Sequence, residues 1–253
     1  YTGIGTQQVE EQLKLVFPNV RCLRMDMDTT SGKTAHRDIL DAFTRREADV
    51  LIGTQMVAKG LDIPNVTLVG VVFADSTLFH SDFRSSERTF QLLTQVAGRA
   101  GRADKEGRVV IQTNAPGHRA IRLCTKHDYK TFYNLEIGDR LRTLFPPFAV
   151  FVRAQFACAD ENAAADAAER FANGVTKTIL TALKPANAEN ELVFALAGAA
   201  PIRRREGLFR YAVIIKLVRT ANTAAAINAI YAFSDGCADE CYRGIEVNPQ
   251  DML

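Results

Sequence analysis

The most informative stretch of this 253-residue sequence reads Gln95-Val96-Ala97-Gly98-Arg99-Ala100-Gly101-Arg102. Arg99 and Arg102 are three residues apart, a spacing that puts both side chains on one face of a helix. Two guanidinium groups on one face suit the binding of a polyphosphate. Taken alone, the pattern is equally typical of a surface Gly-Arg turn or a nonspecific anion patch, because short motifs produce false matches.

A second segment supports the interpretation of the first as a phosphate-binding motif. It reads Gly53-Thr54-Gln55-Met56-Val57-Ala58-Lys59-Gly60-Leu61-Asp62 and directly follows an apolar run that predicts a buried strand. Backbone N–H groups and a hydroxyl at a strand end suit a phosphate, so Gly53, Thr54 and Gln55 are candidate nucleic-acid contacts. Gly60 and Asp62 are candidate nucleotide-binding residues, since the Asp62 carboxylate suits a ribose hydroxyl.

Strand and helix patterns alternate around these segments. Apolar runs predict strands over 20–25, 50–52, 66–73 and 108–112. Helical spacing predicts helices over about 33–46 and 85–100, and an earlier helix with Thr6 as its possible cap. Strands that alternate with helices favour an α/β fold with a parallel sheet and right-handed crossovers.

The sequence Phe145-Pro146-Pro147-Phe148 indicates a domain boundary, because proline disfavours helix continuation. We expect one domain over residues 1–144 and a second over 149–253. The second domain shows the pattern strand, long Ala-rich helix, strand, basic loop, strand, helix, strand. Apart from the basic loop, these elements are expected, in order, over 149–157, 161–183, 192–196, 209–218, 222–233 and 244–247. This order predicts a smaller α+β domain of the split βαβ type.

In this order, the two segments resemble motifs V and VI of superfamily 2 helicases, which belong to the second RecA-like lobe. The residues between them narrow the resemblance to the PriA family of bacterial replication-restart helicases (primosomal protein N′). They include Ser81-Asp82-Phe83-Arg84-Ser85-Ser86-Glu87-Arg88. Matching segments in the second half are Leu144–Phe148, Gly207–Tyr211 and Val247–Leu253, so the resemblance spans nearly the whole chain.

The resemblance implies roles in ATP hydrolysis. Arg102 is implied as an arginine finger, with Arg99 assisting and Gln95 coupling nucleotide to DNA. ATP with magnesium is expected in the full-length protein, whose first lobe supplies the P-loop. Ser31-Gly32-Lys33-Thr34 is not that loop, because Met27 stands where the pattern requires glycine. We therefore expect this chain alone to be inactive as an ATPase.

The resemblance also implies partners for the second domain: forked and single-stranded DNA, single-stranded DNA-binding protein and primosome proteins. The strongest basic cluster, Arg203-Arg204-Arg205, is followed by Arg210, Tyr211 and Lys216. These residues suit salt-dependent contacts with phosphate, and Phe209 or Tyr211 suits base stacking. The opposite interpretation is a solvated basic loop with both aromatic side chains in the core. Arg84, Glu87 and Arg88, at helical spacing, suit either a DNA link or a surface ion-pair cluster.

The amino-acid composition limits the kinds of site and the location that we expect for this chain. A net charge of +2 does not by itself indicate a nucleic-acid binder. Five scattered cysteines favour reduced thiols in a cytoplasmic protein, and Cys237 with Cys241 does not complete a four-ligand zinc site. We assign no metal here; the resemblance implies zinc in a part of the full-length protein outside this sequence. No apolar run approaches the ~18 residues of a membrane span, and the start resembles no secretory signal.

Because the chain has no initiator methionine, we expect it to begin within a longer protein. Three functions remain open from the sequence. The first is the C-terminal half of a 3′-to-5′ DNA helicase of the PriA type. The second is another superfamily 2 translocase, of the RecG kind. The third is a non-catalytic DNA-binding module.

Overall fold

The computed structural model describes residues 5–26, 35–54, 66–80, 82–98, 107–183 and 191–250. The chain forms two compact units, Tyr1–Tyr133 and Asn134–Leu253. None of the helices in the described ranges is both long and apolar enough to cross a membrane.

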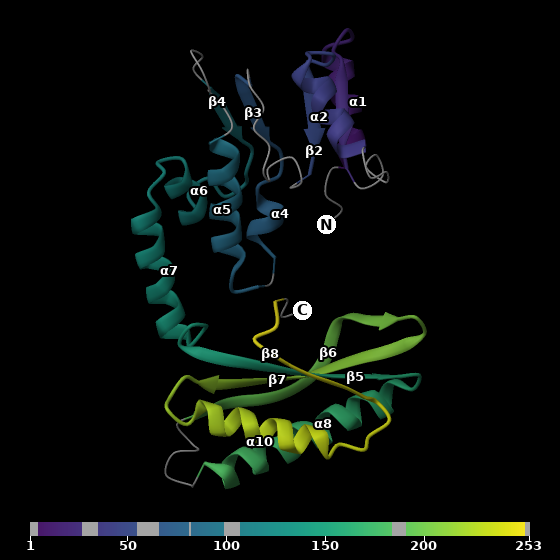
Figure 1. Ribbon diagram of the computed structural model, residues 1–253, viewed down its shortest axis with the longest axis vertical. Coiled ribbons are helices and arrows are strands. Elements are labelled where there is room, and N and C mark those ends of the chain that lie inside the picture. Colours follow the sequence, from purple (N-terminus) through teal and green to yellow (C-terminus); the bar gives the residue numbers. More distant parts are fainter. Residues whose placement is uncertain are drawn as a thin grey trace. The chain divides into compact units, whose positions relative to one another are not determined.

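The first unit contains two pairs of parallel strands (Figure 1). Strand β1 (Cys22–Met25) pairs with β2 (Val50–Gly53), and β3 (Leu68–Val71) pairs with β4 (Arg108–Ile111). The helices are α1 (Thr6–Val16), α2 (Ala35–Thr44), α4 (Asp75–Leu78), α5 (Ser85–Ala97) and α6 (Arg119–Cys124). The parallel pairs and the intervening helices confirm the predicted α/β fold.

Two expected details of the first unit differ from the structure. Thr6 is the first residue of α1 and Gly5 is its cap, because the Thr6 hydroxyl donates to Asp26 Oδ2 (2.5 Å) instead of capping the helix. Helix α5 ends at Ala97, where the N–H of Gly98 closes its last turn. The expected continuation to residue 100 lies outside the described residues.

The core of the first unit forms where α4, α5 and α6 pack together. Phe90 of α5 stacks on Phe132 with ring centroids 4.2 Å apart. The buried members of this cluster are Ala74, Leu78, Phe90, Leu93, Ala120, Ile121, Leu123, Cys124 and Phe132. Asp75 holds the start of α4 to the end of β4, since its carboxylate accepts hydrogen bonds from the Thr113 hydroxyl and the Asn114 N–H, both at 2.8 Å.

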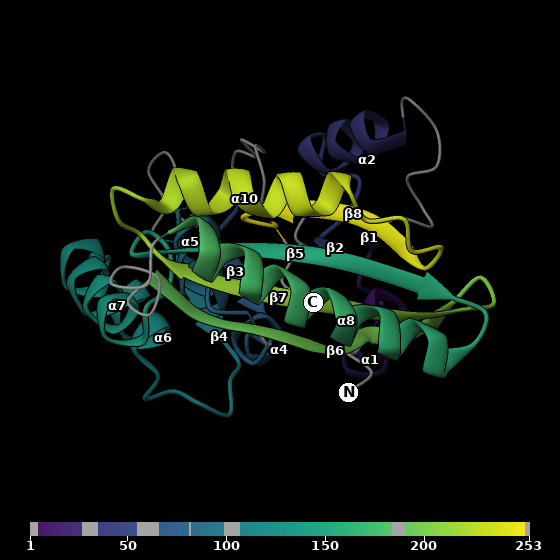
Figure 2. The same ribbon diagram turned by 90° about the horizontal axis from the view of Figure 1, so that it is seen from below.

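The second unit is one antiparallel sheet covered on one face by two helices (Figures 1 and 2). Its elements are β5 (Ala149–Cys158), α8 (Glu161–Ala182), β6 (Leu192–Arg205), β7 (Leu208–Val218), α10 (Thr223–Asp235) and β8 (Tyr242–Val247). The strand order β6-β7-β5-β8 confirms the split βαβ prediction. Inward-facing residues such as Val152, Ile215 and Leu217 pack against Ala168 and Val175 of α8. Small alanines on α8 let the helix lie close to the sheet.

The expected basic loop is wrong: the three arginines end a long strand. Strand β6 runs to Arg205, and the chain reverses at Glu206 and Gly207, which have φ values of 53° and 83°. Positive φ at both central residues matches the twist of a two-residue hairpin. Between Ala199 and Arg204 the register shifts, and such a bulge accommodates a proline within a strand.

This hairpin turn gives a stability prediction. The Gly207→Val substitution places a β-branched side chain at φ 83°, so we expect a loss of about 1–2 kcal/mol in the free energy of unfolding. The Glu206→Gly substitution relieves strain at the neighbouring position and is the matched control. Urea denaturation followed by circular dichroism measures both. Equal stability of wild type and Gly207→Val would contradict this turn geometry.

Helix α7 (Tyr129–Thr143) contains the division between the units, earlier than the proline pair suggested. Its first turns pack into the first unit through Phe132, whereas its last turns contact the second. There, Arg140 Nη1 donates to the Pro146 carbonyl (3.3 Å) and Lys216 Nζ donates to the Thr143 carbonyl (2.8 Å). Pro146 is therefore held to the end of α7 within the second unit.

Candidate functional site

Gln95 is the one predicted catalytic residue within the described ranges. It lies in the last turn of α5 and is exposed, because Ser85, Thr89, Phe90 and Leu93 form the buried face of this helix. The helix thus presents Gln95 to solvent just before the Gly-Arg sequence. Arg99 and Arg102 lie outside the described residues.

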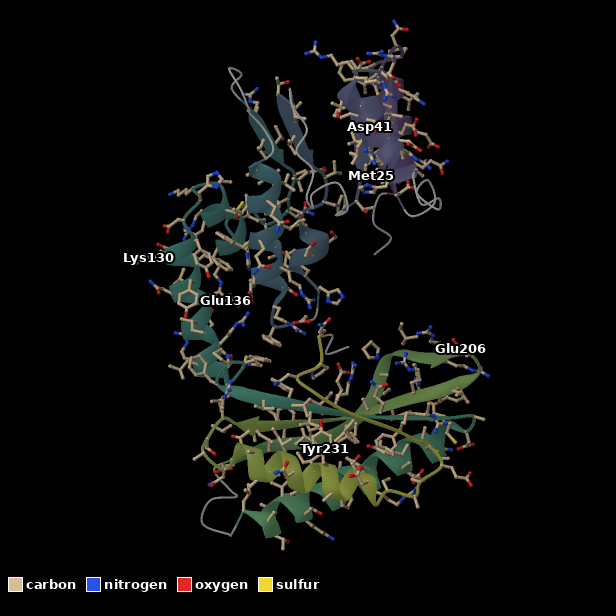
Figure 3. The ribbon with its side chains drawn as sticks, in the orientation of Figure 1. Met25, Asp41, Lys130, Glu136, Glu206 and Tyr231 are labelled. Carbon is tan, nitrogen blue, oxygen red and sulfur yellow. The ribbon has the colours of Figure 1, made fainter. Side chains whose placement is uncertain are left out.

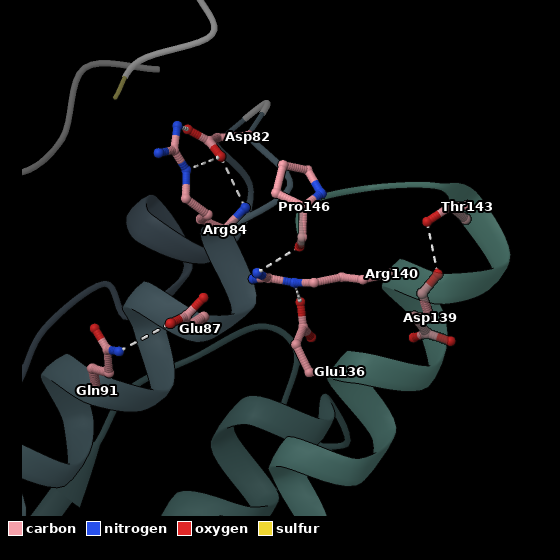
Figure 4. A network of polar contacts seen from close by, with 9 residues as sticks. All are labelled: Asp82, Arg84, Glu87, Gln91, Glu136, Asp139, Arg140, Thr143 and Pro146. Carbon is pink, nitrogen blue, oxygen red and sulfur yellow. Dashed lines mark hydrogen bonds and ion pairs between the residues drawn. The ribbon is translucent and has the colours of Figure 1, made fainter. Parts of the chain in front are cut away.

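The start of α5 is fixed by a buried carboxylate (Figure 4). Asp82 Oδ1 accepts hydrogen bonds from the backbone N–H of Arg84 (2.8 Å) and from its Nε (3.0 Å), and Oδ2 accepts one from its Nη2 (3.0 Å). Arg88 Nη1 lies 3.3 Å from the same Oδ2. The Asp82 side chain is 0% exposed, so both arginines share an acceptor that water does not reach.

Burial, the largest single influence, raises the pKa of Asp82, but the hydrogen bonds from Arg84 and the charge of Arg88 together lower it below its usual range. The carboxylate is therefore ionised at neutral pH. For Arg84, Glu87 and Arg88 the sequence left a DNA link or an ion-pair cluster open, and it did not single out Asp82, which is an acceptor for both arginines. Asp82 lies two residues before Arg84 and six before Arg88, and this spacing was the only feature of the sequence that pointed to the ion pairs.

Gly53 and Thr54 lie at the carboxyl end of β2, and both are exposed. Because β1 and β2 are parallel, Met25 at the end of β1 pairs with Gly53 at the end of β2. Figure 3 labels Met25. Asp26 follows Met25 and holds the first residue of α1 through Thr6. This edge therefore exposes backbone and hydroxyl donors after β2 and stands beside a helix N-terminus. Gln55, Gly60 and Asp62 lie outside the described residues.

Arg203, Arg204 and Arg205 are exposed at the end of β6, and each contacts a different neighbour. Arg203 Nε donates to Glu161 Oε1 at the start of α8 (2.5 Å), which raises the pKa of Arg203. Arg204 lies over the ring of Phe209, 5.0 Å from its centroid. Arg205 Nε lies 3.3 Å from Glu206 Oε1. The hairpin end therefore carries three arginines against two carboxylates.

Tyr211 and Phe209 of the hairpin already make contacts within the chain. Tyr211 donates its hydroxyl to Glu161 Oε1 (3.3 Å) and packs against the core, and Phe209 lies under Arg204. The structure therefore packs Tyr211 against the core, whereas the Phe209 ring is half-buried under Arg204.

Lys216 is not a surface cation. It is buried, and its Nζ lies 4.7, 5.6 and 5.7 Å from the ring centroids of Phe145, Phe151 and Phe194. Burial lowers its pKa. The sequence placed Lys216 in the basic cluster, but the alternation of β7 turns it to the sheet face covered by Phe145.

The sequence of this chain is similar to those of known proteins. Residues 4–104 match the family model described as the helicase conserved C-terminal domain. The replication restart protein PriA of Bacillus subtilis (strain 168) is 45% identical over 230 residues, which are 91% of this chain and 28% of that protein. PriA of Synechocystis is 50% identical over 152 residues, or 60% of this chain and 18% of that protein.

PriA of Treponema pallidum is 40% identical over 191 residues, which cover 75% of this chain and 28% of that protein. The chain thus spans less than a third of the length of these relatives. Residues 4–104 thus match the helicase conserved C-terminal domain, and the chain is similar to replication restart proteins PriA over most of its length.

Proposed function

We propose that this chain is the C-terminal part of a PriA-type replication restart protein. The whole protein would be an ATP-dependent 3′-to-5′ DNA helicase that recognises stalled or branched forks and promotes primosome assembly. The observation that carries the proposal is the 45% identity to Bacillus subtilis PriA over 91% of the chain. These relatives do not favour the RecG-like translocase or the non-catalytic module.

In this proposal the first unit is the second lobe of the motor. ATP with magnesium binds at the other lobe, and Arg102 and Arg99 stabilise the charge that develops on the transferred phosphoryl group. Gln95, on the exposed side of α5, couples the nucleotide to DNA, and Asp62 with Gly60 contacts the nucleotide. Gly53, Thr54 and Gln55 hold the translocated strand, which the exposed carboxyl end of β2 supports.

The proposed partners are DNA forks and single strands, single-stranded DNA-binding protein and the primosome proteins, in the cytoplasm. Zinc is proposed only for a part of the full-length protein outside this sequence. In the described ranges, no group of three or more His, Cys, Asp or Glu side chains is arranged to hold a metal ion.

The test of this function is strand displacement by the full-length protein. We compare a fork with a single-stranded 3′ tail and a fork with a 5′ tail. A 3′-to-5′ motor should unwind the 3′-tailed fork in an ATP-dependent reaction and leave the 5′-tailed fork intact. The reaction without ATP is the control. Tight fork binding with no ATP-dependent unwinding would replace the helicase proposal with a binding module.

The hairpin arginines give a separate prediction on DNA affinity. Replacing Arg203, Arg204 and Arg205 by alanine should weaken fork binding and reduce the slope of log affinity against log salt by up to about 3, at ~0.9 for each lost phosphate contact. Fluorescence anisotropy across a salt series measures both. A triple alanine variant of exposed arginines elsewhere, Arg21, Arg37 and Arg45, is the charge-matched control.

The Glu161→Gln substitution should change fork affinity in the opposite direction. It removes the carboxylate that holds Arg203, so fork affinity should rise. An unchanged salt slope in the triple hairpin variant would contradict phosphate contact by these arginines.

A further inference from the structure

Two tyrosines on the first turns of α7 are exposed although their neighbours are core residues. Tyr129 is 62% exposed and Tyr133 is 49% exposed, whereas Phe132 between them is buried. Residues four apart lie on one side of a helix, so both tyrosines share a face. Their ring centroids are 6.1 Å apart. The proposed helicase function uses neither residue.

The Tyr129 ring packs on one side against the aromatic core of its unit. Its centroid lies 6.2 Å from that of Phe90, and Phe90 stacks on the buried Phe132. One side of Tyr129 therefore rests on packed aromatic rings and the rest is open to solvent. Such a ring loses little conformational entropy when a planar ligand stacks on it.

Three exposed cations lie close to the two tyrosines along the chain. Arg122 lies in the last turn of α6, Lys126 in the connection and Lys130 in the first turn of α7. All three are exposed, and none forms an ion pair in the described part of the chain. Only the residues 125–128 separate the two helices, so these cations lie close to the tyrosines along the chain. Lys130 is directed away from the body of its unit (Figure 3).

The charge balance favours an anionic ligand. From residue 116 to 133 the cations are Arg119, Arg122, Lys126 and Lys130, with His118 and His127, and the acid is Asp128. Asp128 caps α7, since its Oδ1 accepts a hydrogen bond from the Thr131 N–H (3.0 Å). Hydrogen bonding by the side chain and the backbone of Thr131 lowers the pKa of Asp128. Lysine is depleted at protein–protein interfaces, whereas exposed rings beside cations are typical of sites for single strands.

We propose that Arg122, Lys126, Tyr129, Lys130 and Tyr133, the α6–α7 surface, bind single-stranded nucleic acid. The two tyrosine rings stack on bases, and the three cations contact the phosphates of the same strand. Stacking gives affinity without reading sequence, because every base has a π-face. This inference rests on the exposed rings and cations and stands apart from the hairpin and from the residues after β2.

The experiment measures binding of a fluorescein-labelled oligo(dT) strand to the 253-residue chain by anisotropy across a salt series. Tyr129→Ala and Tyr133→Ala should each weaken binding by about tenfold with little change in salt slope. Tyr129→Phe and Tyr133→Phe, which keep the rings, should bind like the wild type. Tyr231→Ala, which removes an exposed tyrosine of α10, is the matched control and should have no effect.

The triple variant Arg122→Ala, Lys126→Ala, Lys130→Ala touches no packed ring and should reduce the salt slope by about 2, at ~0.7 for each phosphate of a single strand. Photocrosslinking of a 4-thiothymidine strand should label the peptide that contains Tyr129 and Tyr133. Unchanged affinity in the folded alanine and triple variants would overturn the proposal. Unchanged strand binding combined with loss of a protein partner would assign the surface to that partner and also overturn it.

The hairpin variant separates the two proposals. Loss of binding when Arg203, Arg204 and Arg205 are changed, with no effect of the α6–α7 variants, removes this inference and leaves the hairpin proposal intact. The reverse pattern removes the hairpin contact and supports the α6–α7 surface.

Discussion

Replacing Arg102 by alanine in the full-length protein should lower the rate of DNA-stimulated ATP hydrolysis by ~10³–10⁵, the range that an arginine finger contributes in related phosphoryl transfer. In the proposed role of an arginine finger, the guanidinium neutralises charge that develops only in the transition state. Because the ground state loses little, fork affinity measured without nucleotide should stay near the wild-type value. Steady-state ATPase assays with saturating fork DNA measure the effect.

Two variants sharpen this result. Arg108→Ala removes an exposed arginine at the start of β4 and should leave the rate unchanged. Arg102→Lys keeps the charge but loses the planar fork of donors, so its rate should remain well below that of the wild type. Full turnover by Arg102→Ala would assign the finger to another arginine. Appreciable turnover by this chain alone would contradict the expectation that the other lobe is required.

Replacing Asp82 by alanine should destabilise the first unit by about 3 kcal/mol, because removal of one partner leaves Arg84 and Arg88 without their buried acceptor. The first turn of α5 also loses the hydrogen bond that Asp82 accepts from the Arg84 N–H. Faster hydrogen exchange of the α5 amides, measured by mass spectrometry, would locate the loss. Asp41→Ala is the control: Asp41 pairs only loosely with Arg37 on exposed α2, so its removal should cost less than about 0.5 kcal/mol. Equal protection of α5 in both variants would contradict a structural role for Asp82.

The same carboxylate predicts a pH dependence. The pKa of Asp82 is lower in the folded protein than in the unfolded chain, where aspartate titrates near ~3.9. Its contribution to stability is therefore complete above that value and is lost as the pH falls through the folded pKa. Asp49, whose pKa Arg21 lowers to about 2, titrates in the same acid range. The difference in urea midpoint between wild type and Asp82→Asn isolates Asp82: it should shrink below about pH 4. A constant difference from neutral to acid pH would contradict this assignment.

Much of the fold follows from local sequence. The strands predicted over 20–25, 50–52, 66–73 and 108–112 agree within a few residues with β1 (Cys22–Met25), β2 (Val50–Gly53), β3 (Leu68–Val71) and β4 (Arg108–Ile111), because short apolar runs between turn signals favour strands. Helix α8 begins at Glu161 because the Asp160 side chain caps it, a signal that lies within a few residues. The Gly-Thr and Gly-Arg segments indicated a helicase lobe through their resemblance to motifs V and VI, and the matched family model agrees.

Local sequence patterns predicted the alternation of strands and helices, the motif resemblance and the basic stretch from Arg203 to Arg205. The three-dimensional packing was needed to see that these arginines end a strand, that Asp82 accepts from both Arg84 and Arg88, and that Lys216 is buried under Phe145. The difference lies in the distance along the chain over which each effect acts. Capping and periodicity act over a few residues, whereas burial of a charge depends on segments such as Phe145 and Lys216 that meet only after the sheet has formed.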